Sequence, residues 1–335
     1  MGVNALNKWK IGCAALALSL LLGALTGCLG ETPVAEVTVV AENRLADKLY
    51  YTEYSDGTAV LTGYDGTLTE LILPETIDGL PLVGIGNQAF ANAPALTTLR
   101  CGANITWIGD EAFYGCTALT TVEMDTTVKQ IGYYAFEGTP WLSNQTDEFI
   151  LAGDGVLLKY QGSAAHVVIP DTVKVLSDAF FRNDTMVEVT LGANVERLGG
   201  YAFAYCSQLR AVNLNEGLKS IGDSAFAFCD NLRAVTVPDS VTELGPSSFL
   251  YCTMLRRVVL GEAVTCIGEN AFNYCNHLTS ITLNRALTAV GDYAFYECYV
   301  LGGVTYAGTS DEWAAITIGV GNSSMTDAAL RCLAD

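Results

Sequence analysis

The stretch LRAVTVPDSVTELGPSSFLYC, residues 232–252, decides the fold because its pattern recurs along the chain with a fixed period. Near its start lies the alternation Val235-Thr236-Val237, which is typical of a strand with one buried face. Near its end lies Phe249, which belongs to a column of phenylalanines. Successive members are 23 residues apart, except for one step of 44 residues. The column is Phe90, Phe113, Phe136, Phe180, Phe203, Phe226, Phe249, Phe272 and Phe295. A repeat of this length indicates a stacked array of coils.

One such coil cannot bury its own apolar side, whereas stacked coils share a continuous core. We therefore expect a repeat solenoid in which each 23-residue coil adds one short strand to a parallel sheet. Each phenylalanine should stack on that of the next coil. A glycine stands four residues before the phenylalanine in every repeat but one, which indicates either a left-handed backbone or close packing of adjacent coils.

The step of 44 residues interrupts the array. It contains two apolar runs around Gly153-Asp154-Gly155, a pattern that predicts a β-hairpin. We place this insertion at about 141–166, within leucine-rich repeats that cover 81–305. Because solenoid ends need caps, residues 49–80 are expected to form an N-terminal β cap and residues 306–335 a C-terminal cap.

The N-terminus has the pattern of a bacterial targeting segment. Lys8 and Lys10 precede an apolar run at 11–25, which is short for a transmembrane helix. The sequence Leu25-Thr26-Gly27-Cys28 then resembles a lipobox, in which the cysteine is acylated. We expect a signal peptide at 1–27, lipidation of Cys28 and a tether at 28–48, which places the protein outside the cytoplasm on the bacterial cell surface. An ordinary signal peptide with an incidental cysteine is the alternative.

The formal net charge of −19 restricts the partners. It argues against a nucleic-acid binder, which needs a basic footprint. It also argues against electrostatic docking on an anionic membrane. Contact with the membrane is therefore expected through the lipid anchor only.

The unit at 232–252 and its siblings resemble the BspA-like leucine-rich repeats of bacterial surface lipoproteins. The segment 306–316, YAGTSDEWAAI, and Thr139-Pro140-Trp141-Leu142 before the expected hairpin are also similar to that family. The resemblance covers about residues 50–335. It implies a right-handed solenoid with one strand per repeat on its concave side, display on the cell surface, and adhesion or ligand binding.

Residues that could suggest chemistry are better explained by the repeat. Six cysteines lie three residues after a phenylalanine and form a column of small buried side chains, without the paired spacing of a zinc site. Gly222-Asp223-Ser224 superficially resembles a hydrolase motif, but its slot varies between repeats, so Ser224 is expected on the surface. His166 and His277 lie in different coils. We expect no enzyme, no catalytic residue, no metal and no cofactor. The cysteine column is Cys116, Cys206, Cys229, Cys252, Cys275 and Cys298.

One surface column is a candidate ligand contact. Arg210, Arg233 and Arg256 occupy the same repeat position, with Arg257 beside them, between buried strand residues. Stacked like charges are unfavourable unless acids or a ligand compensate them. Solvated arginines balanced by neighbouring acids are the alternative. We predict a non-catalytic, adhesin-like protein that binds an extracellular protein or glycan. A structural or self-assembling cell-envelope protein is the second hypothesis.

Overall fold

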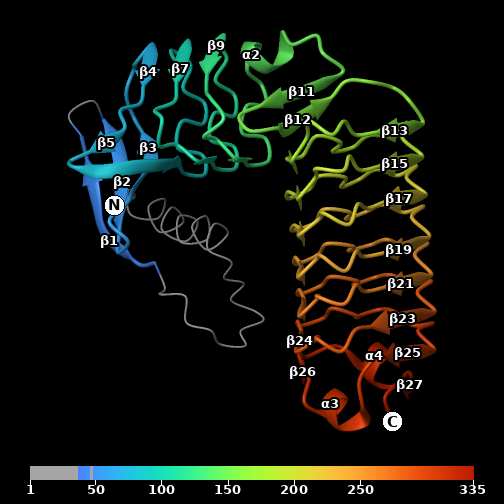
Figure 1. Cartoon of the computed structure of the whole chain (residues 1–335). Coiled ribbons are helices and arrows are strands. Elements are labelled where there is room, and N and C mark those ends of the chain that lie inside the picture. Colours follow the sequence, from blue (N-terminus) through green and yellow to red (C-terminus); the bar gives the residue numbers. More distant parts are fainter. Residues whose placement is uncertain (1–36, 46–47) are drawn as a thin grey trace, which may run out of the picture. The chain divides into compact units, whose positions relative to one another are not determined.

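The computed structural model describes residues 37–45 and 48–335, which fall into two compact units. The first unit contains the described residues up to Val156, and the second runs from Leu157 to Asp335. Each unit is a stack of coils with short strands and little helix (Figure 1). In the part of the chain that the structure describes, no helix has the length and apolar character needed to cross a membrane.

The first unit begins with antiparallel strands and continues as parallel coils. Strand β1 pairs with β2 and β2 with β3 in antiparallel fashion, and β3 then pairs in parallel with β6. The order β1-β2-β3-β6-β8-β10 makes one sheet, to which β5 adds, and β4-β7-β9 makes a second. The elements are β1 (Val39–Arg44), β2 (Leu49–Tyr54), β3 (Ala59–Tyr64), β4 (Glu70–Ile72), β5 (Thr76–Ile77), β6 (Leu80–Ile85), β7 (Thr98–Arg100), β8 (Trp107–Ile108), β9 (Thr121–Glu123), β10 (Gln130–Ile131), α2 (Pro140–Ser143) and β11 (Phe149–Ala152).

Two of these strands differ from the expected boundaries. Strand β1 lies within 28–48, which we expected to be a tether, because the β-branched residues before Ala41 extend the chain alongside β2. Strand β4 lies within the expected cap at 49–80 but pairs in parallel with β7, so the coils begin earlier than residue 81. The first coil was hard to recognise because its step to the next is longer than 23 residues, with Glu70 opposite Thr98.

The second unit contains two sets of parallel strands. The two-residue strands and β12 follow the order β12-β14-β16-β18-β20-β22-β24-β26, and longer strands form β13-β15-β17 and β19-β21-β23-β25-β27. The strands are β12 (Val156–Tyr160), β13 (His166–Val168), β14 (Val175–Leu176), β15 (Glu188–Thr190), β16 (Arg197–Leu198), β17 (Ala211–Asn213), β18 (Ser220–Ile221), β19 (Ala234–Thr236), β20 (Glu243–Leu244), β21 (Arg257–Val259), β22 (Cys266–Ile267), β23 (Ser280–Leu283), β24 (Ala289–Val290), β25 (Gly303–Tyr306), β26 (Thr317–Ile318) and β27 (Ala329–Cys332).

Each regular coil therefore contributes two strands, and our expectation of one strand per repeat was incomplete. In the coil that carries β17 and β18, Val212 is half-buried in the first strand and Ile221 is buried in the second. A strand of two residues is too short to show the alternation of period two by which strands are recognised in a sequence. The expected hairpin is present as β11 and β12, which flank the turn at 153–155.

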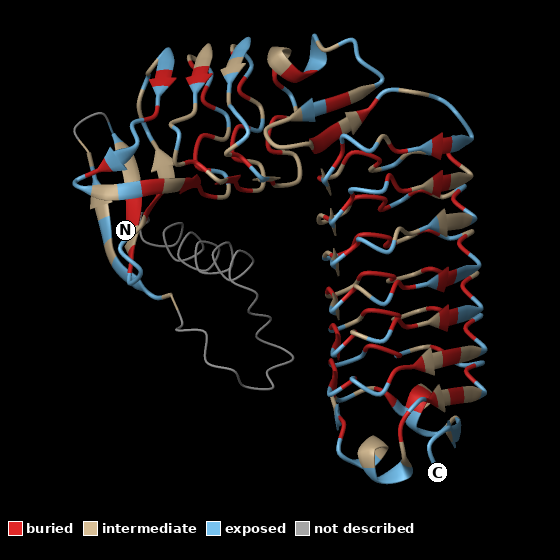
Figure 2. Ribbon diagram, in the orientation of Figure 1, coloured by how far each residue is buried: buried red, intermediate tan, exposed pale blue. Residues whose placement is uncertain are grey.

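The phenylalanine column forms a stacked spine in each unit. In the first unit, the rings of Phe90 and Phe113 have centroids 5.2 Å apart and planes within 7°. In the second unit the centroid distances along the column from Phe180 to Phe295 lie between 5.0 and 5.3 Å. These steps match the separation of neighbouring strands. The spine is the centre of the core, and Figure 2 shows buried residues along the inside of the coils.

The glycine column is explained by close packing rather than by a left-handed backbone. A Cβ atom on Gly245 would lie 2.7 Å from the carbonyl carbon of Gly222 in the preceding coil. The same clash with preceding backbone occurs at Gly268, where the nearest atom would be at 2.6 Å. Neither residue has a positive φ. The glycines therefore allow consecutive coils to approach at this corner.

Residues 306–335 add strands to both sets of the second unit. Strand β26 pairs with β24 and β27 with β25, with α3 (Ser310–Ala314) and α4 (Ser323–Thr326) between them. Helix α3 begins with a capping box formed by Thr309 and Glu312. Before this end, the backbone N–H of Phe272 donates to the carbonyl of Ala294. The backbone N–H of Phe295 donates instead to the side-chain oxygen of Asn322, so this amide takes the place of the carbonyl that the next coil would supply.

Candidate ligand-contact surface

The arginine column lies at the entrance to the longer strands of the second unit. The N–H of Arg233 donates to the carbonyl of Arg210 at 3.4 Å, and that of Arg256 donates to Arg233 at 2.8 Å. These hydrogen bonds hold the three residues in register, one coil apart. Only Arg257 lies within a strand, β21, where it pairs with Ala234 and Ser280. We call Arg210, Arg233, Arg256 and Arg257 the arginine column.

We predicted that Arg210, Arg233 and Arg256 lie between buried strand residues and face outward, with Arg257 beside them. Arg210, Arg233 and Arg256 each lie one residue before a strand, because the strands begin at Ala211, Ala234 and Arg257. The preceding leucines, such as Leu232, are buried and anchor the turn, so the arginine after each leucine projects from the corner. All four side chains are exposed.

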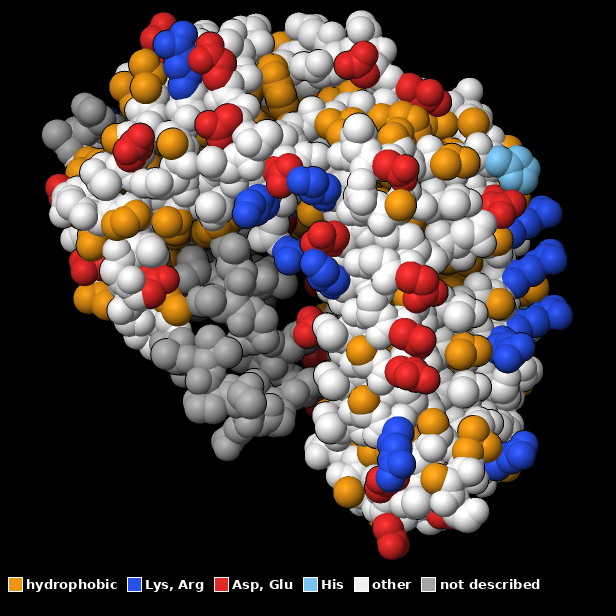
Figure 3. Space-filling view, viewed as in Figure 1, with side chains coloured by type: hydrophobic (Ala, Val, Ile, Leu, Met, Phe, Trp, Pro, Cys, Tyr) orange, Lys and Arg blue, Asp and Glu red, His pale blue; other side chains and the backbone are white. Residues whose placement is uncertain are grey.

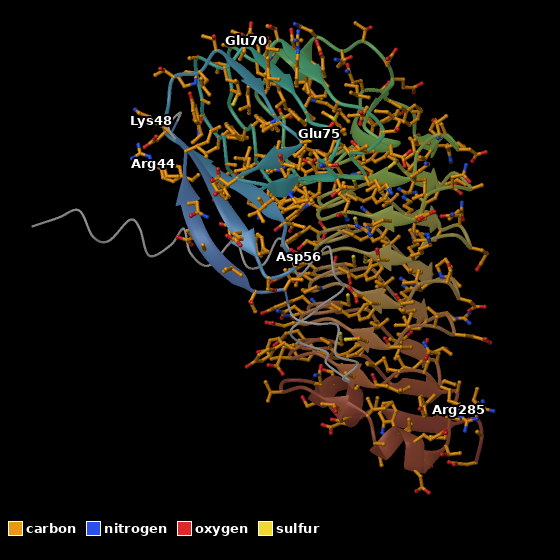
Figure 4. All side chains as sticks on the ribbon, turned by 60° about the vertical axis from the view of Figure 1, so that its left-hand side comes forward. Arg44, Lys48, Asp56, Glu70, Glu75 and Arg285 are labelled. Carbon is orange, nitrogen blue, oxygen red and sulfur yellow. The ribbon has the colours of Figure 1, made fainter. Side chains whose placement is uncertain are left out.

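Within residues 37–45 and 48–335, no member of the arginine column forms an ion pair. Several other surface cations are paired: Lys219 lies 2.7 Å from Glu196, and Arg100 lies 3.1 Å from Glu123. Arg285, labelled near the C-terminal end in Figure 4, donates to Glu312 at 2.9 Å. The column is thus a row of uncompensated positive charge, as Figure 3 shows along one edge of the second unit.

Two acids near the column, Asp230 and Glu188 opposite Ala211, are engaged elsewhere. Glu188, in the strand before Arg210, accepts hydrogen bonds from Asn213 at 2.9 Å and contacts His166 at 3.2 Å. Burial raises the pKa of the Asp230 carboxyl, three residues before Arg233, although Thr253 hydrogen bonds to it. A guanidinium in contact would instead lower that pKa. These acids therefore do not neutralise the column.

Small and hydroxyl-bearing side chains surround the column. Arg257 pairs with Ala234 of the coil before it and with Ser280 of the coil after it. Ala211 occupies the same strand position directly after Arg210. Two positions further on, the outward residues include Thr236 and Thr282, which offer hydroxyl groups. The column is therefore not covered by bulky neighbours on these strands.

A second column, of aromatic side chains of which Tyr205 is exposed and the other three are half-buried, was missed in the sequence. Two residues after the core phenylalanines lie Tyr205, Phe228, Tyr251 and Tyr274, whose rings stack at centroid distances of 4.5, 5.0 and 4.3 Å. All four have φ between 56° and 61°, a conformation unusual for aromatic residues. The same position in the first unit holds Asn92, Gly115 and Gly138. The aromatic residues at this position recur every 23 residues in the sequence, but this recurrence does not predict how their rings are arranged.

The six cysteines of the cysteine column are buried and form no disulfide. The Sγ of Cys229 donates to the carbonyl of Phe203 at 3.1 Å, and Cys252 makes the same contact with Phe226. Burial raises the pKa of the Cys206 and Cys298 thiols to about 12. Because the thiolate is the reactive form, these side chains act as packed polar links between coils.

The other candidate chemical residues do not converge. His277 contacts the carbonyl of Thr253 at 2.7 Å, whereas His166 contacts Glu188. Ser224 is only 7% exposed, so our expectation of a surface position was wrong: the tight corner turns its hydroxyl onto Asp223 at 2.7 Å. No group of histidine, cysteine and acidic residues with the geometry of a metal site occurs in the described part of the chain. Cys28, the expected lipidation site, and the expected signal peptide lie outside the described residues.

The family comparison agrees with this repeat geometry. The model of the BspA-type leucine-rich repeat region, in six copies, matches residues 64–151 and 159–302, which is more than half of the chain. This chain belongs to the BspA-type leucine-rich repeat family. The two matched ranges leave out β11's turn and β12's first residues, where the hairpin interrupts the BspA-type repeats. No curated protein matches the chain.

Solved structures of leucine-rich repeat proteins also match the BspA-type array. A leucine-rich cell surface protein from Faecalibacterium prausnitzii is 18% identical, with 86% of this chain and 99% of that chain covered and a TM-score of 0.41. The pneumococcal vaccine antigen PcpA is 13% identical, with 84% and 99% covered and a TM-score of 0.44. A leucine-rich repeat protein from Eubacterium ventriosum is 19% identical, with 84% and 94% covered and a TM-score of 0.40.

Proposed function

We propose that this protein is a cell-surface lipoprotein that binds an extracellular protein or glycan, in the manner of an adhesin, without catalysing a reaction. The observation that carries the proposal is the arginine column, which forms no ion pair with any residue of 37–45 or 48–335 in a chain of net charge −19. Charged rows without partners are unfavourable in isolation. A partner with complementary charge would offset that repulsion and gain specificity from the fixed spacing.

The binding test compares two variants with the same change in net charge. The first carries Arg210→Ser, Arg233→Ser and Arg256→Ser, and the second carries Arg100→Ser, Lys219→Ser and Arg285→Ser, which removes ion-paired cations. Each protein is applied in a dilution series to immobilised matrix proteins and to a glycan array. We expect wild-type protein and the paired-cation variant to bind one partner in common, and the column variant to lose it. Equal binding by all three would contradict the role of the column.

The anchor is proposed from the lipobox-like residues that end at Cys28. Acylation of this cysteine would hold the repeats at the outer face of a membrane, because more than one acyl chain gives stable attachment. Metabolic labelling with a radioactive fatty acid should mark the wild-type protein and leave Cys28→Ser unlabelled. Labelling of the variant would refute the anchor.

A structural role in the envelope is the second candidate, and the last strand favours it. In the described chain, β27 pairs with β25 on one edge, and its other edge has no strand partner. Leu330 and Leu333 beside this edge are 41% and 52% exposed. Open strand edges are templates for pairing with a second chain. Sedimentation that increases with protein concentration, and that Leu330→Lys abolishes, would support self-assembly. A monomer at all concentrations would exclude it.

A further inference from the structure

The arginine column also indicates what class of partner it fits. We propose that it binds the acidic groups of a linear acidic polysaccharide that lies along the stacking direction of the second unit. This inference rests on the proposed binding function and narrows its partner from protein or glycan to an anionic glycan.

The geometry of the column favours a repeating ligand over a compact one. Backbone hydrogen bonds from Arg233 to Arg210 and from Arg256 to Arg233 fix the three residues one coil apart. One coil step is about 4.8 Å, so the three arginines span about 10 Å. A guanidinium pairs well with the planar oxygens of a carboxylate and with other oxyanions. A chain with acidic groups at regular intervals can engage several arginines at once, whereas a single acid engages one.

The surroundings favour sugar rings between those acidic groups. The residues beside the column, Ala211, Ala234 and Ser280, are small and leave the guanidinium groups accessible along one line. Thr236 and Thr282 follow on the outward side of the same strands and can exchange hydrogen bonds with sugar hydroxyls. Both features suit a ligand that alternates anions with hydroxyl-rich units.

The charge of the whole chain disfavours a denser polyanion. A nucleic acid carries about one charge per 1.7 Å in its duplex form, so its repulsion by a chain of net charge −19 is strong. A polysaccharide with one carboxylate per sugar, such as polygalacturonate, has fewer charges for the same length than such a duplex. It can therefore contact the column while its neutral groups face the acidic remainder of the surface.

The experiment uses the full-length protein and four soluble polymers. Heparin supplies sulfates, polygalacturonate supplies carboxylates, dextran is a neutral control and single-stranded poly-dT supplies phosphates. Binding is measured by calorimetry for wild type, for the column variant (Arg210→Ser, Arg233→Ser, Arg256→Ser) and for the paired-cation variant (Arg100→Ser, Lys219→Ser, Arg285→Ser). Circular dichroism checks that all three are folded.

We expect wild type to bind heparin or polygalacturonate, with the sulfated and carboxylated arms showing which anion it prefers, and to ignore dextran. The column variant should bind at least about tenfold more weakly, as expected when several charge contacts are lost. The paired-cation variant should match wild type, and oligomers long enough to span the column should bind better than a single acidic sugar.

Three results would overturn the inference. One is equal weakening in both triple variants, which would reflect net charge alone. Another is tighter binding of poly-dT than of either acidic glycan. The third is absence of binding to both acidic glycans while a matrix protein still binds through the same arginines, which would leave the proposed function standing. If wild type binds no partner of any class, the proposed function itself fails.

Discussion

At the scale of single residues, the repeat uses each position for a separate physical purpose. Phenylalanine supplies stacked apolar surface at the centre, and cysteine links neighbouring coils by donating its thiol hydrogen to a backbone carbonyl. A buried polar atom needs such a partner, since leaving it unpaired is unfavourable. The cysteines are thus better described as small hydrogen-bonding core residues than as reactive ones.

The raised pKa values of these thiols predict a pH dependence. A thiol in the folded protein stays neutral where an unfolded thiol, with a pKa of 9.0, would ionise. Because burial raises the folded pKa of Cys206 and Cys298 to about 12, this contribution to stability is fully present below about pH 9. It is lost as the pH rises from there toward 12. The midpoint of urea unfolding should therefore fall between about pH 7.5 and about pH 10.

The control is the variant Cys229→Ala, Cys252→Ala, Cys275→Ala, which removes three buried thiols whose pKa values burial also raises. Its midpoint will be lower than that of wild type at neutral pH, because small cavities remain. The test is the slope with pH, which should be shallower in the variant. Parallel slopes would contradict the contribution of the buried thiols.

At the scale of elements, the structure adds a second strand to each coil and places a glycine directly after it. Gly245 follows β20, and the corner brings it against Gly222 of the preceding coil. Because the glycine has no side chain, the backbones of consecutive coils stay at about the distance between neighbouring strands of a sheet. The two strands of one coil can then belong to two different sheets. The glycine column is a packing requirement of this corner.

Substitution of this glycine is expected to destabilise the second unit. In Gly245→Ala the new Cβ would lie 2.7 Å from the carbonyl carbon of Gly222, so the coils must separate locally. We expect a loss of about 1–3 kcal/mol in the free energy of unfolding, typical of overpacking. Gly200→Ala is the matched control, since its nearest neighbour would be at an ordinary 3.6 Å. Urea unfolding of both variants decides the matter, and equal midpoints would contradict the close-packing account.

At the scale of the whole molecule, the charge balance affects stability and binding in opposite ways. The net charge of −19 repels itself in the compact state. The arginine column is the exposed place where the described surface offers unpaired positive charge in a row. Salt screens both effects over about 8–10 Å at physiological ionic strength.

Added salt should therefore stabilise the protein while weakening its complex. Raising sodium chloride from about 50 mM to about 200 mM should raise the thermal midpoint. It should also lower the affinity for the acidic partner by an order of magnitude or more if the complex contains several ionic contacts. Differential scanning calorimetry and a binding titration on the same samples measure the two quantities. A partner whose affinity is insensitive to salt does not bind through the arginine column.

Much of the fold follows from the sequence alone. The 23-residue phase predicts the coils, the stacked phenylalanines and the buried cysteine column, because a repeated coil can only bury its apolar side against its neighbours. The turn at 153–155 predicts the interruption by a hairpin. These features depend on local pattern and on period, both of which are visible in one chain.

Other features were decided by tertiary structure. The two-residue strands were not recognised because they exist only through pairing with the coils before and after. The same pairing places β1 in a sheet and turns Ser224 inward onto Asp223. It begins the strands directly after Arg210, Arg233 and Arg256, and it stacks Tyr251 on Tyr274. A sequence pattern gives the order of residues within a coil, whereas the direction of each side chain depends on where the backbone turns to meet the next coil.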